Sequence, residues 1–110
     1  MQSNLEEQFH AAMLNIYEQG TRLKPSYRAT RFRQMVLSLG GKAAADQLLS
    51  APGVSDGFTE LFLRGPENLR LSVEYVVLQE PWRPLFTDEQ RAVARKRLHD
   101  MGVELPEGAA

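Results

Sequence analysis

Residues 69–78 read Leu-Arg-Leu-Ser-Val-Glu-Tyr-Val-Val-Leu, and this stretch decides the fold class. Its apolar residues alternate and several are β-branched, a pattern that favours a strand. However, Ser72 followed by Glu74 is typical of a helix N-cap with an acid in the first turn. No other stretch of the sequence has the pattern of a partner strand, and a lone strand cannot satisfy its backbone hydrogen bonds. We therefore predict a helix here, which makes the whole chain all-α.

The stretches on either side carry helix signals of their own. Ser3 and Glu6 form a predicted capping box, and the helical apolar stripe behind it ends at Gly20 in the left-handed conformation. Pro25 suits the first turn of a second helix over residues 26–39. A third helix is predicted over residues 43–49. A fourth begins at a cap on Ser55 or Asp56 and ends at Gly65-Pro66. The last begins at a second capping box on Thr87 and ends at Gly102.

These elements predict a compact single domain of five to six short helices over residues 1–102, followed by a loosely ordered tail over 103–110. Leu39 is expected to face the core together with its helical neighbours. The predicted core takes apolar residues from every helix: Phe9, Met13, Ile16, Phe32, Met35, Val36, Leu48, Phe58, Leu61, Val73, Val77 and Leu98.

Composition excludes several classes of protein. The chain has 110 residues, of which 43% are apolar and 25% charged, which is typical of one globular domain. It has no cysteine, which excludes disulfides, a thiol nucleophile and thiolate zinc sites. No secretory signal is recognisable, and no apolar stretch approaches the roughly 20 residues of a membrane span. We expect a cytoplasmic protein with no membrane partner and no cofactor.

The formal net charge is only −1, but the two signs are segregated along the chain. Residues 19–45 carry six basic residues and no acid, whereas residues 46–90 carry eight acids and three basic residues. Such asymmetry indicates either an anionic partner or a basic segment that pairs with the acidic one inside the fold. We favour internal pairing, because charges of both signs are normally interspersed on a protein surface.

The basic stretch 22–33 is the strongest candidate for a functional surface. Aromatic residues interleave with its cations, a mixture that can hold phosphates and stack bases. Two predicted helices joined by Gly40-Gly41 also fit a helix-turn-helix, although the second helix offers few side chains that could read bases. Trp82, between two prolines, either plugs the edge of the core or serves as an exposed anchor. The candidate contacts to a protein partner or to nucleic acid are Arg22, Lys24, Tyr27, Arg28, Arg31, Arg33 and Trp82.

No motif in the sequence supplies catalysis. Gly40-Gly41-Lys42 follows a helix rather than a strand, and Ala43 stands where a phosphate loop needs a hydroxyl. Asp56 and Glu60 are four residues apart, but a metal site or a glycosidase pair needs a further carboxylate from elsewhere. We predict no catalytic, cofactor-binding or metal-ligating residue. An enzyme ranks third among the possible functions, because nothing brings a nucleophile, a base and an orienting group together.

Several short motifs occur in an order that resembles a family of short bacterial proteins and domains without an established activity. The motifs are Tyr27-Arg28-Ala29-Thr30-Arg31-Phe32, Gly40-Gly41, Leu48-Leu49, Gly57-Phe58-Thr59, Leu71-Ser72-Val73-Glu74, Pro84-Leu85-Phe86 and Ala94-Arg95-Lys96-Arg97-Leu98. The likeness covers roughly residues 14–101, most of the chain. The resemblance implies a compact helical domain of bacterial origin and assigns no functional residue.

The leading hypothesis is a non-enzymatic interaction module that binds a protein partner or a second copy of itself. It would use the exposed part of the basic stretch and the connector around Trp82. The alternative is a nucleic-acid-binding accessory protein that uses residues 22–33.

Overall fold

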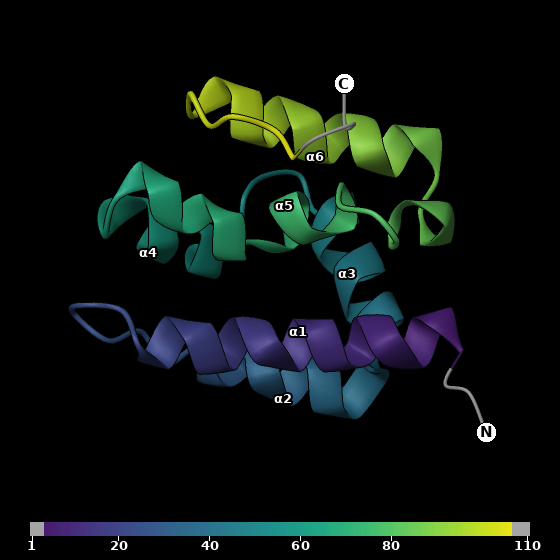
Figure 1. Ribbon diagram of the computed structural model, residues 1–110, viewed down its shortest axis with the longest axis horizontal. Helices are drawn as coiled ribbons and strands as arrows, with labels where there is room; N and C mark the ends of the chain where they lie inside the picture. The colour runs from purple at the N-terminus through teal and green to yellow at the C-terminus, as the bar shows by residue number, and fades with distance from the viewer. Residues whose placement is uncertain (1–3, 107–110) are drawn as a thin grey trace.

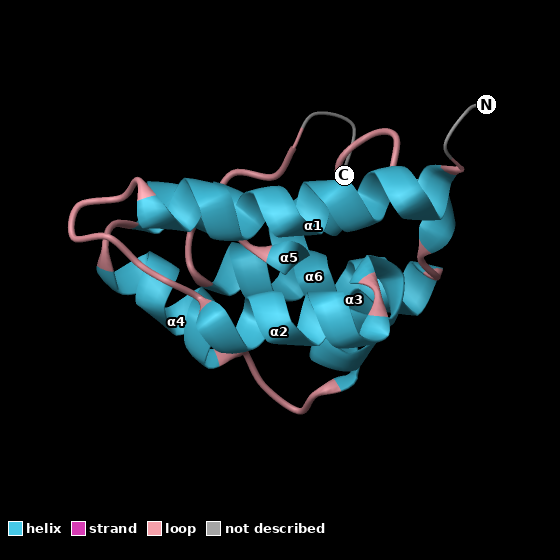
Figure 2. Cartoon of the chain, turned by 90° about the horizontal axis from the view of Figure 1, so that it is seen from below, coloured by secondary structure: helices cyan, strands magenta, loops and turns pink. Residues whose placement is uncertain are grey.

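The computed structural model describes residues 4–106 and has an all-α fold. Its elements are α1 (Leu5–Thr21), α2 (Thr30–Leu39), α3 (Gly41–Ser50), α4 (Asp56–Leu63), the 3-10 helix η1 (Pro66–Leu71), α5 (Val73–Val77), the 3-10 helix η2 (Arg83–Leu85) and α6 (Asp88–Asp100). No strand occurs within residues 4–106 (Figure 2). The predicted fold class is therefore confirmed.

The helices form layers that α3 connects. Figure 1 shows α1 and α2 together below, α6 above, and α4 and α5 between them. α3 runs across these layers and contacts α1, α2, α5 and α6. The molecule measures 39 × 29 × 25 Å. Within residues 4–106, no helix has both the length and the apolar character that crossing a bilayer requires.

The stretch 69–78 is helical, as predicted, and lies at the centre of the fold. Ser72 is the N-cap of α5: its hydroxyl accepts a hydrogen bond from the N–H of Tyr75 at 3.2 Å and donates one to the carbonyl of Leu69 at 2.6 Å. Five of the six residues from Ser72 to Val77 are buried. A short helix buried on nearly every side needs no polar stripe, which explains why its sequence resembles a strand.

The core combines the long helices with this central segment. Phe9 and Met13 of α1, Val77 of α5 and Leu98 of α6 are fully buried. Phe9 meets the rings of Trp82 and Phe86 edge-on, with centroids 5.7 and 5.2 Å apart. Nine of the twelve predicted core residues are buried; the exceptions, Phe32, Met35 and Leu48, are only partly buried. The prediction that Leu39 faces the core was wrong, because Leu39 is 49% exposed at the end of α2.

Both ends of α1 differ from the prediction. Ser3 lies outside the described residues, and the N-cap is Asn4, whose side chain accepts a hydrogen bond from the N–H of Glu7 at 2.8 Å. Gly20 does not end the helix in a left-handed conformation, because α1 continues through Thr21. Glycine is needed at position 20 for another reason: a Cβ there would lie 2.9 Å from the carbonyl oxygen of Tyr27.

α2 begins at Thr30 rather than at residue 26. The preceding residues are held in a non-helical path, because the N–H of Tyr27 donates to the carbonyl of Gly20 at 2.9 Å. In addition, Arg64 binds the carbonyls of Pro25 and Ser26. Pro25 therefore belongs to the loop between α1 and α2, and these long-range contacts outweigh the local preference for a helix start.

The first part of the predicted tail is packed rather than loose. Val103 and Leu105 pack against the core, and Pro106 is buried. Gly102, with a φ of 71°, ends α6 as predicted and turns the chain back toward the core. The remainder of the predicted tail, residues 107–110, lies outside the described residues.

The start of α3 is built against α1. Gly40, with a φ of 91°, turns the chain sharply out of α2. The N–H of Gly41 then donates to Nδ1 of His10 at 2.9 Å, so a histidine from α1 satisfies one of the orphan donors at the start of α3. The backbones are close here, since a Cβ on Gly41 would lie 2.6 Å from the Cα of His10.

We predict that Gly41→Ala lowers the free energy of unfolding by about 1–3 kcal/mol, because the added methyl forces α1 and α3 apart. Gly53→Ala is the matched control: Gly53 lies in the loop between α3 and α4, where a Cβ meets nothing within 4 Å. Urea unfolding measures both variants. Equal stability of the two would show that α1 and α3 are not in close contact at this point.

Candidate functional site

A largely apolar cavity of about 610 Å³ opens between α1, α2, α3, α4 and the segment from η1 to α5. Its volume is in the range of pockets that bind ligands or anchor side chains, about 300–1,000 Å³. Six apolar residues, contributed by five of these elements, account for much of its wall: Ile16, Phe32, Met35, Leu48, Leu61 and Leu71. Phe32, Met35 and Leu48 are partly buried because their side chains border this cavity.

The mouth of the cavity carries unpaired cations. Arg28 and Arg31 border it and are both exposed, and neither makes an ion pair with any residue in the range 4–106. Asp56 and Glu60 of α4 border it as well, but Glu60 is neutralised by Arg64 at 2.6 Å. The unpaired charges at the mouth are therefore two cations and one acid, which gives it an excess of positive charge.

Arg64 fixes the loop that carries Arg28. Its guanidinium donates to the carbonyl of Pro25 at 2.8 Å and to that of Ser26 at 3.3 Å, and it lies 5.0 Å from the ring centroid of Tyr27. Tyr27 is thereby held at the cavity mouth, where burial and then Glu60 raise the pKa of its phenol. Nothing in the local sequence distinguishes Arg64, because its partners lie 38 and 39 residues earlier in the chain.

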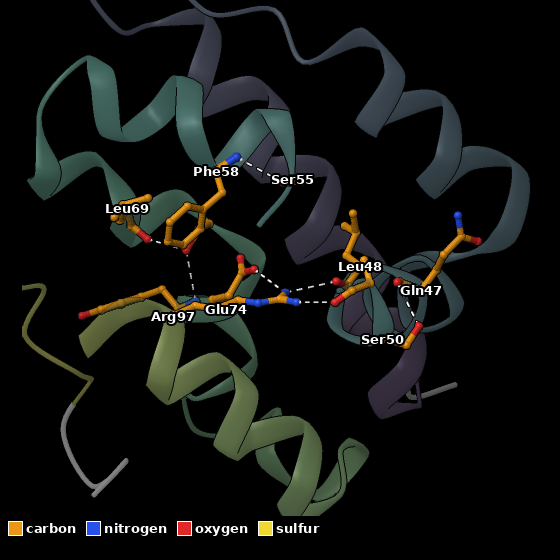
Figure 3. A network of polar contacts seen from close by, with 11 residues as sticks. Gln47, Leu48, Ser50, Ser55, Phe58, Leu69, Glu74 and Arg97 are labelled. Carbon is orange, nitrogen blue, oxygen red and sulfur yellow. Dashed lines mark hydrogen bonds and ion pairs between the residues drawn. The ribbon is translucent and has the colours of Figure 1, made fainter. Parts of the chain in front are cut away.

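The cavity floor includes one member of a buried ion pair. Glu74 of α5 borders the cavity, and its Oε2 lies 3.0 Å from Nη1 of Arg97 on α6. The two side chains are only 4% and 11% exposed. Arg97 also donates to the carbonyls of Leu48 and Ala51, at 3.1 and 2.7 Å, and so joins α6 to the end of α3 (Figure 3). The pair carries no local signal in the sequence, because its members are 23 residues apart.

The structure brings together only part of the predicted candidate surface. Tyr27, Arg28 and Arg31 gather at the cavity mouth. Arg22 and Lys24 are exposed in the preceding loop, away from the cavity lining. Arg33 lies 5.6 Å from the ring centroid of Tyr17 on α1.

Trp82 is partly buried against Phe9 and does not border the cavity. This is the arrangement expected of a residue that plugs the edge of the core.

The predicted internal pairing of the basic stretch was wrong. Among the described residues, no acid forms an ion pair with Arg22, Lys24, Arg28, Arg31 or Arg33. Five of the eight acids of residues 46–90 pair instead with cations of residues 42–97, and in four of these pairs the partners are only three or four positions apart in the sequence. Such local pairs form without bringing distant segments together, so the basic stretch stays available.

The residues most often used in catalysis are dispersed. His10 serves α3 through its hydrogen bond to Gly41, and His99 is exposed on α6 beside Asp100. Residues 4–106 contain no group of three or more histidine and carboxylate side chains arranged to hold a metal ion. The cavity combines apolar walls, a positive mouth and a buried carboxylate.

No protein family model matches the chain, and no curated protein or solved structure is detectably similar to it. The family resemblance noted from the sequence stays a prediction.

Glu74→Ala should lower the free energy of unfolding by about 3–5 kcal/mol, because it leaves the guanidinium of Arg97 buried without its carboxylate. Urea unfolding measures the loss. Asp100→Ala is the control, since it removes a carboxylate that pairs with Lys96 at the surface and should leave stability unchanged. A small, equal effect for both variants would contradict the structural role of the buried pair.

Stability should also depend on pH through Glu74. Burial raises the pKa of its carboxyl above the ordinary 4.5, despite the opposing hydrogen bonds from its own backbone and from Arg97. The folded chain therefore holds this proton more tightly than the unfolded chain. The protonated carboxyl contributes fully to the free energy of unfolding below pH 4.5, and this contribution is lost as pH rises through the raised pKa. Urea unfolding across this range should show Glu74→Gln gaining stability relative to the wild type as pH rises. The opposite trend would mean that Arg97 outweighs burial.

Proposed function

We propose that this protein is a non-enzymatic interaction module that binds a protein partner, whose apolar anchor side chains enter the cavity between α2, α3 and α4. The observation that carries the proposal is the apolar cavity with Arg28 and Arg31 unpaired at its mouth. Anchoring of a few buried side chains in such a pocket is how most protein interfaces obtain their affinity. Bacterial origin and a cytoplasmic location stay predictions from the sequence.

The charges at the mouth support an acidic partner. Two exposed guanidiniums without a carboxylate partner can each form charge-assisted, bidentate hydrogen bonds to Asp or Glu of another chain. Because both are already free of internal ion pairs, no existing pair has to be broken when the partner binds. The fitting partner segment carries apolar anchors for the cavity and acidic side chains beside them.

Nucleic acid fits the same surface less well, although the five unpaired cations favour it as a second candidate. Arg31 and Arg33 are two positions apart on α2, which places them about 200° apart around the helix axis. Arg31 accordingly borders the cavity, while Arg33 lies over Tyr17. The cations therefore do not form one stripe along which a phosphate backbone could run, and Asp56 at the cavity mouth would repel it.

The test is a selection from a library of displayed random peptides of about 16 residues, a length that spans roughly 24 Å as a helix. We expect selected peptides to carry apolar residues flanked by Asp or Glu. The double variant Arg28→Glu with Arg31→Glu should bind them at least about tenfold more weakly, a loss of about 1.4 kcal/mol or more.

The matched control is Arg22→Glu with Lys24→Glu, which changes the net charge equally at exposed positions outside the cavity lining. Its binding should stay close to that of the wild type. Equal weakening by both double variants, or no selected peptide that depends on Arg28 and Arg31, would overturn the proposal. Salt-sensitive binding of a DNA or RNA duplex that both double variants weaken would favour the nucleic-acid candidate instead.

A further inference from the structure

Resting on the proposed function, we infer that the partner segment binds as an amphipathic helix, with its apolar face in the cavity and acidic side chains along the edge that meets Arg28 and Arg31. The conformation of the partner follows from the hydrogen-bonding capacity of the cavity and its mouth.

An extended segment would find few backbone partners at this site. An extended peptide gains affinity chiefly when its backbone pairs with the free edge of a sheet. Residues 4–106 contain no strand and so offer no such edge. The cavity is instead walled mainly by helices, whose interior N–H and C=O groups already bond within each helix.

The non-helical residues at the mouth are also largely engaged. In the segment Tyr27–Ala29, the N–H of Tyr27 donates to Gly20, the carbonyl of Arg28 accepts from Thr30 at 2.8 Å, and that of Ala29 accepts from Arg33 at 2.9 Å. Three of the six backbone N–H and C=O groups of this segment are therefore already hydrogen-bonded, and the segment cannot form a continuous ladder with an extended peptide. An extended peptide buried here would leave backbone groups unpaired, at a cost of roughly 1–3 kcal/mol each.

A helical segment avoids this cost, because its backbone hydrogen bonds are internal. It can present apolar side chains at positions i, i+3 or i+4, and i+7 as one stripe to the cavity. Acidic residues that flank this stripe then lie at the edge of the cavity, within reach of Arg28 and Arg31 at its mouth. The wall also suits such side chains, since Leu48, Met35 and Phe32 are flexible or flat apolar residues from two different helices.

The experiment takes one peptide from the selection described above and compares three forms: the original, a form with proline at a central position that faces solvent, and a form with alanine at that same position. Fluorescence anisotropy measures affinity and circular dichroism measures helix content on binding. We expect the alanine form to bind as the original does. The proline form should bind at least about tenfold more weakly, because proline breaks a helix interior. The complex should contain more helix than the separate components.

Two outcomes overturn the helical binding mode alone, and they are separable from failure of the proposed function. If the proline and alanine forms bind equally well, or if binding adds no helix, the segment is extended or polyproline-like. If this happens while the Arg28→Glu with Arg31→Glu variant still loses binding and Arg22→Glu with Lys24→Glu does not, the interaction site stands and only the helical mode fails. If binding ignores Arg28 and Arg31, the site itself fails, and the inference fails with it.

Discussion

The guanidinium of Arg97 is the point at which α6, α5 and the end of α3 meet. It lies against the carboxylate of Glu74 and against the carbonyls of Leu48 and Ala51, which would otherwise be among the unpaired acceptors at a helix C-terminus. A cation at this end of a helix also complements the helix dipole. Because Glu74 and Leu48 both border the cavity, the contact that attaches α6 also sets the positions of the cavity floor and one wall.

Arg64 has a comparable role in the loop before α2. Like Arg97, it donates to backbone carbonyls from a distant part of the chain and pairs with a carboxylate. Arginine suits both positions, because its planar guanidinium offers five donors that can serve several acceptors at once. The basic residues therefore have two roles: Arg64 and Arg97, both largely buried, hold the backbone around the cavity, while the arginines of the stretch 22–33 remain exposed and only Arg28 and Arg31 border the cavity.

Local signals in the sequence predicted most of the helices. Ser55, Ser72 and Thr87 are N-caps in the structure, because each satisfies a donor three residues ahead and needs no distant partner. The start of α2 could not be predicted in this way, since Tyr27 is held by Gly20 and its neighbours by Arg64.

The candidate site was only partly predictable for the same reason. Arg28, Arg31 and Tyr27 were recognisable as candidates, but Phe32, Met35 and Leu48 have the periodicity of core residues whether they face a filled interior or a cavity. The pairing of cations was mispredicted because the sequence gives net charge by segment, whereas ion pairs depend on which side chains lie within 4 Å.

The hydrogen bond between His10 and Gly41 has a consequence for how the chain divides. An isolated α3 has no side-chain cap of its own, since position 40 is glycine and the acceptor for the N–H of Gly41 comes from α1. The helix that crosses all the layers is thus completed by the first helix of the fold, and through Arg97 it is tied to the last. Severing the chain between α1 and α2 and separating the pieces would deprive the larger fragment of a helix start as well as of core side chains. The first and last helices of the fold, α1 and α6, therefore belong to one cooperative folding unit.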